Sequence, residues 1–93
     1  MDTSAVLSAE TEKWAKKIAV ELENAEAASP KGKEMLKNIR AYVKDSAHFA
    51  DKGDPVRSFE AIIWAFAWLE IGVDLQHIAK DYVDIRKLRT NRY

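Results

Sequence analysis

Four ionisable side chains near the C-terminal end of the chain have the types and spacing of a metal or acid–base site. Glu70, Asp74, His77 and Asp81 are separated by four, three and four residues, which places them on one face of a helix. Carboxylates beside an imidazole can ligate a divalent cation or transfer protons. Metal sites in helical bundles draw ligands from two or more helices, and no other segment has a matching set. We therefore interpret these four residues as a solvated polar face and predict neither a metal site nor a cofactor.

Glu70 also differs from its immediate neighbours. It is the only ionisable residue in the apolar stretch 61–73, and a charge in such surroundings is usually paired. Arg40 or Lys44 could supply the positive partner. We predict a partly buried, paired structural acid, with a functional acid as the alternative.

Motifs for other common chemistries are absent from the sequence. The chain has no cysteine, which excludes disulfides, thiolate zinc sites and a cysteine nucleophile. Its three glycines, Gly32, Gly53 and Gly72, lie too far apart to form a phosphate-binding loop. Ser46 and His48 are close in sequence but have no third catalytic partner. We therefore predict that the protein is not an enzyme.

Residues that favour helix starts divide the chain into three segments. Ser8 precedes an acidic turn, as an N-cap residue does. Ser29-Pro30 and Asp54-Pro55 each combine a capping side chain with a proline suited to the first helical position. The predicted helices cover about residues 8–28, 30–52 and 55–88.

These helices predict the fold class. The short connection around Gly53 favours an antiparallel pair of the second and third helices, and no strand signal is present. The predicted fold is all-α, a three-helix up-down-up bundle with a long third helix. Residues 1–93 form one domain, and a basic tail follows at about 86–93.

The third predicted helix is apolar on two sides. One row, from Phe59 to Val73, suits a core, while a second row contains two of the three tryptophans of the chain. The two other helices cannot cover both apolar sides of this helix, so one side is expected to be exposed. Exposed aromatic patches mark interaction sites. The candidate interaction surface consists of Trp64, Trp68, Ile71, Leu75, Ile78, Tyr82 and Ile85.

Charge and hydropathy limit the classes of partner. Fifteen basic and fifteen acidic residues give a net charge of zero, unlike the basic excess of most nucleic-acid or membrane-surface binders. The longest apolar stretch is too short to span a bilayer, and the start of the chain lacks the pattern of a signal peptide. We predict a cytoplasmic protein-interaction module that binds an unknown protein partner or forms a homo-oligomer.

Two alternatives remain open from the sequence. The first is an accessory RNA- or DNA-associated protein that uses the basic second helix and the tail. The tail contributes Arg86, Lys87, Arg89 and Arg92. The second is a metal-binding enzyme built on Glu70, Asp74 and His77.

Two motifs in the helical hairpin point to a known family. Lys52-Gly53-Asp54 and Trp68-Leu69-Glu70-Ile71-Gly72 occur in the order and spacing of a Lys-Gly-Asp turn followed by a Trp-Leu-acid-x-Gly run. Through these motifs the segment 41–75 resembles the DUF357 family of short archaeal proteins of unknown function. The resemblance implies a three-helix bundle and an archaeal cytoplasmic protein, and it implies no activity. The chain differs from the family in carrying Phe66 where many members have a histidine, and Glu70 where they have an aspartate.

Overall fold

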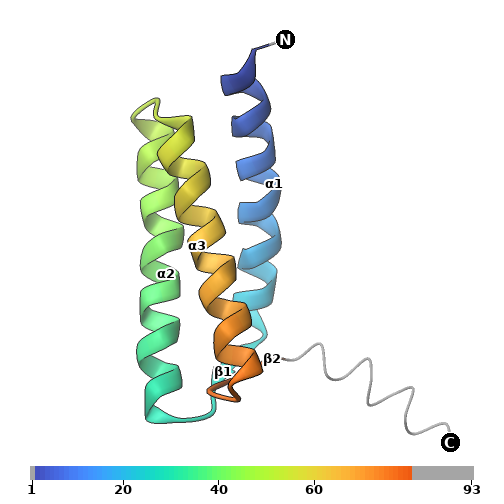
Figure 1. Cartoon of the computed structure of the whole chain (residues 1–93), viewed down its shortest axis with the longest axis vertical. Coiled ribbons are helices and arrows are strands. Elements are labelled where there is room, and N and C mark those ends of the chain that lie inside the picture. The colour runs from blue at the N-terminus through green and yellow to red at the C-terminus, as the bar shows by residue number, and fades with distance from the viewer. Residues whose placement is uncertain (1, 81–93) are drawn as a thin grey trace, which may run out of the picture.

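Three helices and one small sheet make up residues 2–80, the part of the chain that the computed structural model describes (Figure 1). The all-α class is therefore confirmed in its coarse form, because the two strands within the described residues have three residues each. β1 and β2 pair antiparallel, with Glu26 opposite Ala79. The elements are α1 (Thr3–Glu23), β1 (Ala25–Ala27), α2 (Pro30–Asp51), α3 (Pro55–Asp74) and β2 (Ile78–Lys80).

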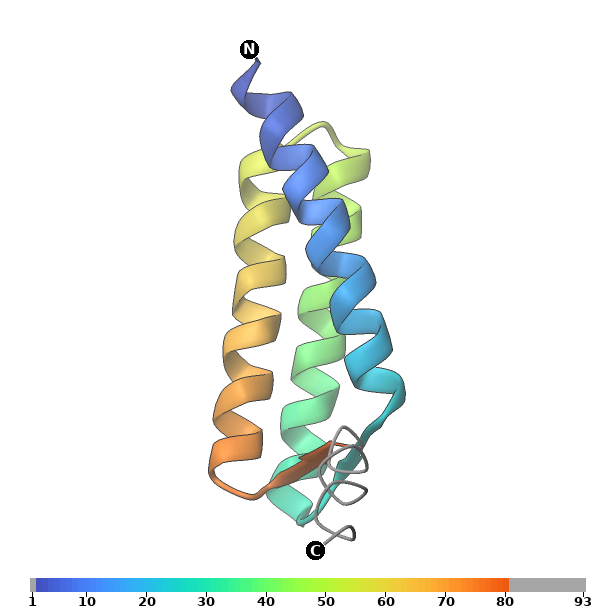
Figure 2. The ribbon, with the colours of Figure 1, turned by 90° about the vertical axis from the view of Figure 1, so that its right-hand side faces the viewer.

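The three helices lie side by side along the long axis of the molecule. α1 and α3 run in one direction and α2 runs in the other (Figures 1 and 2). α3 packs against both other helices, most extensively against α2. The two strands meet at one end of the bundle, where they join the α1–α2 connection to the segment after α3 (Figure 2).

Capping side chains start α2 and α3 at the prolines that the sequence analysis selected. The Ser29 hydroxyl accepts a hydrogen bond of 3.0 Å from the Gly32 N–H, and the Asp54 carboxylate accepts one of 3.1 Å from the Arg57 N–H. Each bond satisfies a backbone donor that the first helical turn leaves unpaired. Between the two helices, Gly53 adopts φ +75°, the left-handed conformation that glycine takes at low cost.

The predicted range of the first helix, 8–28, is wrong at both ends. Asp2 is the N-cap and accepts a 3.0 Å hydrogen bond from the Ser4 N–H, so the helix starts well before Ser8. It ends at Glu23, although alanine and glutamate in the following residues favour helix. Pairing of β1 with β2 overrides that preference.

The predicted third helix, 55–88, is wrong over residues 75–80. α3 ends at Asp74, and Gln76 then reverses the chain at φ 63°. This left-handed conformation is unusual for a residue with a Cβ atom. Because the turn uses glutamine instead of glycine, the sequence contains no signal for it. The rest of the predicted helix and the basic tail at 86–93 lie outside the described residues.

The apolar core occupies the half of the bundle nearest the sheet and includes residues from all three helices and from β2. Its buried members are Ile18, Leu22, Met35, Leu36, Ile39, Ile62, Ala65, Leu69 and Ile78.

Two buried serines form a polar contact between α2 and α3 in the other half of the bundle. The Ser46 hydroxyl donates to the Ser58 carbonyl over 2.8 Å, and the Ser58 hydroxyl donates to the Ser46 carbonyl over 2.7 Å. Both residues are buried, and the two bonds are reciprocal. They place Ser46 and Ser58 at the same level of the bundle.

The cap of α2 provides the first testable prediction. The Ser29 hydroxyl also lies 2.8 Å from Nδ1 of His77, so one side chain links the start of α2 to the turn after α3. We expect Ser29→Ala to lower the free energy of unfolding by about 2 kcal/mol, the upper end of the range for a lost N-cap. Urea unfolding followed by circular dichroism measures this change.

A matched control separates the two contacts of Ser29. Asp54→Ala removes the cap of α3, which has no histidine contact, so its cost should stay near 1 kcal/mol. Equal costs for the two substitutions would show that the His77 contact adds nothing.

Candidate interaction surface on the third helix

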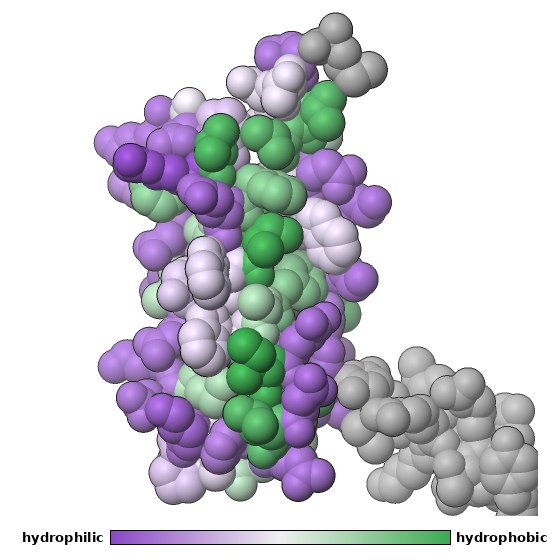
Figure 3. Space-filling model, in the orientation of Figure 1, coloured by the Kyte–Doolittle hydropathy of each residue, from purple (hydrophilic) through white to green (hydrophobic). Residues whose placement is uncertain are grey.

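A row of large apolar side chains, three on α3 and one at its C-cap, is exposed to solvent. The exposed fractions are 54% for Trp64, 38% for Trp68, 39% for Ile71 and 62% for Leu75. We call these four residues the tryptophan stripe. Figure 3 shows a green apolar band running lengthwise along the molecule, with pale residues of intermediate hydropathy and purple hydrophilic residues beside it.

The packing of α3 explains why this row is left uncovered. Ile62 and Leu69 are buried in the core, while Phe66 packs edge-on against Trp14 of α1 with 5.2 Å between ring centroids. The core side and the α1 side of α3 are thus occupied. Because helical positions repeat every 3.6 residues, the tryptophan stripe lies on the remaining side.

A groove borders the tryptophan stripe on its α2 side. It has a volume of about 460 Å³, and Trp68 is its only α3 lining residue. Three α2 residues at intervals of seven, Lys31, Asn38 and Asp45, contribute its exposed polar wall. The surface therefore combines an apolar row with a polar margin, the arrangement typical of protein interfaces.

One residue of the seven in the predicted surface is buried, and the placement of two others is not described. Ile78 is 2% exposed and lies in the core, so its assignment to the surface is wrong. The turn at Gln76 redirects the chain and breaks the helical spacing on which that assignment depended. Tyr82 and Ile85 lie outside the described residues.

Within residues 2–80, Glu70, Asp74 and His77 do not form a cluster. Glu70 and Asp74 are exposed on α3, whereas His77 lies in the turn beyond the helix. The prediction that Glu70 is partly buried is wrong, and within residues 2–80 it forms no ion pair with Arg40 or Lys44. No group of three metal-ligating side chains comes together in that range. Asp81 lies outside the described residues.

Comparison with known proteins identifies the family. The model of a family described as proteins of unknown function, DUF357, matches residues 9–78. The chain belongs to the DUF357 family. Protein AF1782 from Archaeoglobus fulgidus, also a DUF357 protein, has a similar crystal structure, with a TM-score of 0.78 and 37% sequence identity over 85% of this chain and 99% of that one. The comparison with curated proteins finds no match.

The family match covers both the tryptophan stripe and Ile78, the last core residue. The DUF357 model therefore spans the candidate surface together with the core that supports it. Within residues 2–80, no helix is long and apolar enough to cross a membrane.

The structure of this DUF357 protein brings together one serine–histidine pair that no sequence motif indicates. Ser29 and His77 are far apart in sequence but lie in hydrogen-bond contact. The Ser29 oxygen accepts from the Gly32 N–H, and within residues 2–80 no carboxylate orients His77. The pair lacks the third member of a catalytic triad, and its contacts are those of a helix cap tied to a turn.

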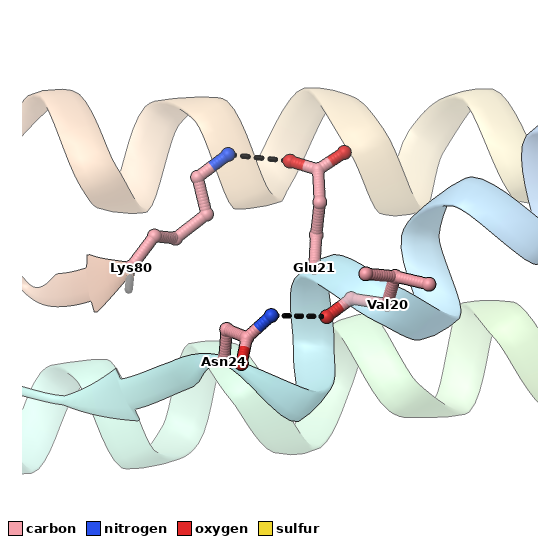
Figure 4. Close-up of polar contacts among 4 residues, drawn as sticks. All are labelled: Val20, Glu21, Asn24 and Lys80. Carbon is pink, nitrogen blue, oxygen red and sulfur yellow. Dashed lines mark hydrogen bonds and ion pairs between the residues drawn. The ribbon is translucent and has the colours of Figure 1, made fainter. Parts of the chain in front are cut away.

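An ion pair fastens β2 of the DUF357 protein to α1. The Lys80 ammonium contacts the Glu21 carboxylate, and both side chains are mostly buried, with 14% and 24% exposed (Figure 4). Close by, the Asn24 side-chain amide donates a hydrogen bond of 3.1 Å to the Val20 carbonyl at the C-terminal end of α1. No sequence pattern indicates the Lys80–Glu21 contact, because the strand pairing brings the two residues together.

Proposed function

We propose that this DUF357 protein is a non-enzymatic interaction module that binds a protein partner through the tryptophan stripe. The observation that carries the proposal is the exposure of four large apolar side chains in one row, three on α3 and one at its C-cap. Soluble proteins rarely leave such a row uncovered without a binding role. Tryptophan is also among the residues that contribute most to binding energy at interfaces.

The arrangement of the three helices suits the binding of a protein partner. The proposal takes the three helices as an up-down-up bundle, and the opposite directions of α2 and α3 in Figure 1 support it. Packing of α3 against both other helices holds the stripe on a preorganised surface, which reduces the entropy lost on binding. We place the protein in the cytoplasm, a proposal supported by its cysteine-free sequence.

The nucleic-acid alternative has less support. It depends on residues 86–93, outside the described range, and on α2. Along α2, Lys33, Lys37, Arg40 and Lys44 form one exposed basic row, but Asp51 ends this row and the chain as a whole has no excess of positive charge. Phosphate binding needs a concentrated positive patch.

Site-specific photo-crosslinking tests the interaction function. A photoreactive side chain at position 71 would lie within the stripe, and one at the exposed position 13 of α1 serves as the control. In extract of the source cells, position 71 should give discrete adducts that position 13 does not give. Trp68→Ser should reduce these adducts about thirtyfold or more, as expected for a tryptophan that anchors an interface.

The stripe variant must keep the fold for this test to be informative. Trp68 is substantially exposed, so Trp68→Ser should change the free energy of unfolding by less than about 1 kcal/mol. Circular dichroism and urea unfolding check this. Adducts of equal yield from positions 71 and 13, unaffected by Trp68→Ser, would contradict the proposed function.

A further inference from the structure

We propose that the occupant of the tryptophan stripe is a second copy of this chain, packed antiparallel about a two-fold axis level with Asn38 and Phe66. This inference rests on the proposed function and names its partner. Its basis is the order of aromatic and charged residues along the face formed by α2 and α3. When a second copy is inverted and placed against this face, aromatic residues meet aromatic residues and each positive charge meets a negative one.

The Ser46–Ser58 bonds give the register needed to place the axis. Each serine donates to the carbonyl of the other, so the two residues share one level. Asn38 precedes Ser46 by eight residues and Phe66 follows Ser58 by eight residues. α2 and α3 are antiparallel and each helical residue rises about 1.5 Å, so Asn38 and Phe66 also lie at one level.

The tryptophans are symmetric about this level. Trp64 and Trp68 lie two residues before and two residues after Phe66. A two-fold axis that inverts the direction of α3 therefore sets Trp64 of one copy against Trp68 of the other, twice. Both rings are partly exposed in the single chain, and pairs of aromatic rings favour offset or edge-on packing.

The charges beside the groove are symmetric about the same level but opposite in sign. Lys31 and Asp45 each lie seven residues from Asn38, are exposed, and line the groove next to Trp68. Inverting one copy brings each Lys31 opposite an Asp45. A parallel arrangement would instead set lysine against lysine and aspartate against aspartate, which is unfavourable.

The two features have different roles in the pair. Burial of the stripe removes apolar area from water and supplies the attraction. Exposed ion pairs add little affinity, but the repulsion in the wrong arrangement selects the antiparallel orientation. At the axis, Asn38 meets its own copy, and an amide can donate and accept in the same contact.

Single-cysteine variants test the arrangement, because the natural chain has no cysteine. Under mild oxidation Asn38→Cys should form a disulfide-linked dimer. Lys31→Cys alone and Asp45→Cys alone should not, whereas a mixture of these two should give a linked heterodimer. Lys16→Cys, on the exposed surface of α1, is the control for random collision.

Sedimentation equilibrium of the unmodified protein tests the charges. The wild-type chain should dimerise at micromolar to tens of micromolar concentration. Lys31→Glu should weaken the dimer about tenfold or more, and the combined variant Lys31→Glu with Asp45→Lys should restore wild-type affinity, because the swap regenerates both ion pairs.

The outcomes distinguish this inference from the function on which it rests. If the protein stayed monomeric up to about 1 mM but still gave position-71 adducts in extract, the inference of a dimer would be overturned. The proposed interaction function would remain. A monomer with no stripe-dependent adducts would overturn both. A dimer in which Lys31→Cys and Asp45→Cys each link to themselves would overturn the antiparallel arrangement.

Discussion

Gly32→Ala is expected to destabilise the protein by about 3 kcal/mol or more, or to prevent folding. A Cβ atom at this position would lie 1.9 Å from the His77 carbonyl oxygen and 2.9 Å from its carbonyl carbon. Both are backbone atoms, and that oxygen also accepts a 2.8 Å hydrogen bond from the Ala28 N–H. The turn therefore cannot move away without breaking the hydrogen bond that joins Ala28, just before α2, to His77, just before β2.

The sign of this effect makes it informative. Within an unobstructed helix, replacing glycine by alanine stabilises by about 1 kcal/mol. Urea unfolding followed by tryptophan fluorescence measures the difference, and Lys33→Ala on the neighbouring exposed position should stay within about 0.5 kcal/mol of wild type. Stability of Gly32→Ala at or above the wild-type value would rule out the close approach of α2 to the turn.

The second large effect concerns Ile78. Ile78→Ala should lower the free energy of unfolding by about 3 kcal/mol, since the residue is 2% exposed and its truncation leaves a cavity in the core. Leu75→Ala, three residues earlier and 62% exposed, should change stability by less than about 0.5 kcal/mol. The same denaturation experiment measures both values.

A double substitution provides the control for the packing of Ile78. A Cβ atom at Gly72 would lie 2.5 Å from Cδ1 of Ile78, so Gly72→Ala clashes with that side chain. In the Ile78→Ala background the clash disappears, and the cost of the pair should be less than the sum of the single costs. If the changes in the free energy of unfolding were additive, or if Ile78→Ala had a small effect, Ile78 would instead be exposed. That result would fit an α3 that continues through residue 78.

Local chemistry predicted the parts of the fold that depend on neighbouring residues. Serine or aspartate followed by proline marks the starts of α2 and α3, because the capping bond and the proline ring act within one turn. Apolar spacing also located the row that contains Trp64 and Trp68, whose exposure follows from the side of α3 on which they lie.

The errors arose where distant segments meet. Ala25–Ala27 has helical propensity but forms a strand, because Ile78–Lys80 pairs with it. The apolar spacing continues past Gln76, yet a left-handed turn at a residue other than glycine interrupts the helix there. Glu70 looked buried because its sequence neighbours are apolar, although the side of the helix, and not the neighbours, determines its exposure. The strand pairing and the turn at Gln76 have no signal within one segment, whereas the exposure of Glu70 follows from its side of α3.

The sheet has a consequence for the order in which the chain folds. α2 and α3 are joined by a connection of three residues, so their contacts close a short loop. Pairing of Ala27 with Ile78 must instead bring together residues 51 positions apart, and the entropy lost on closing a loop grows with its length. We therefore expect the helical hairpin that carries the tryptophan stripe to assemble early, and the two-stranded sheet to form last and open first.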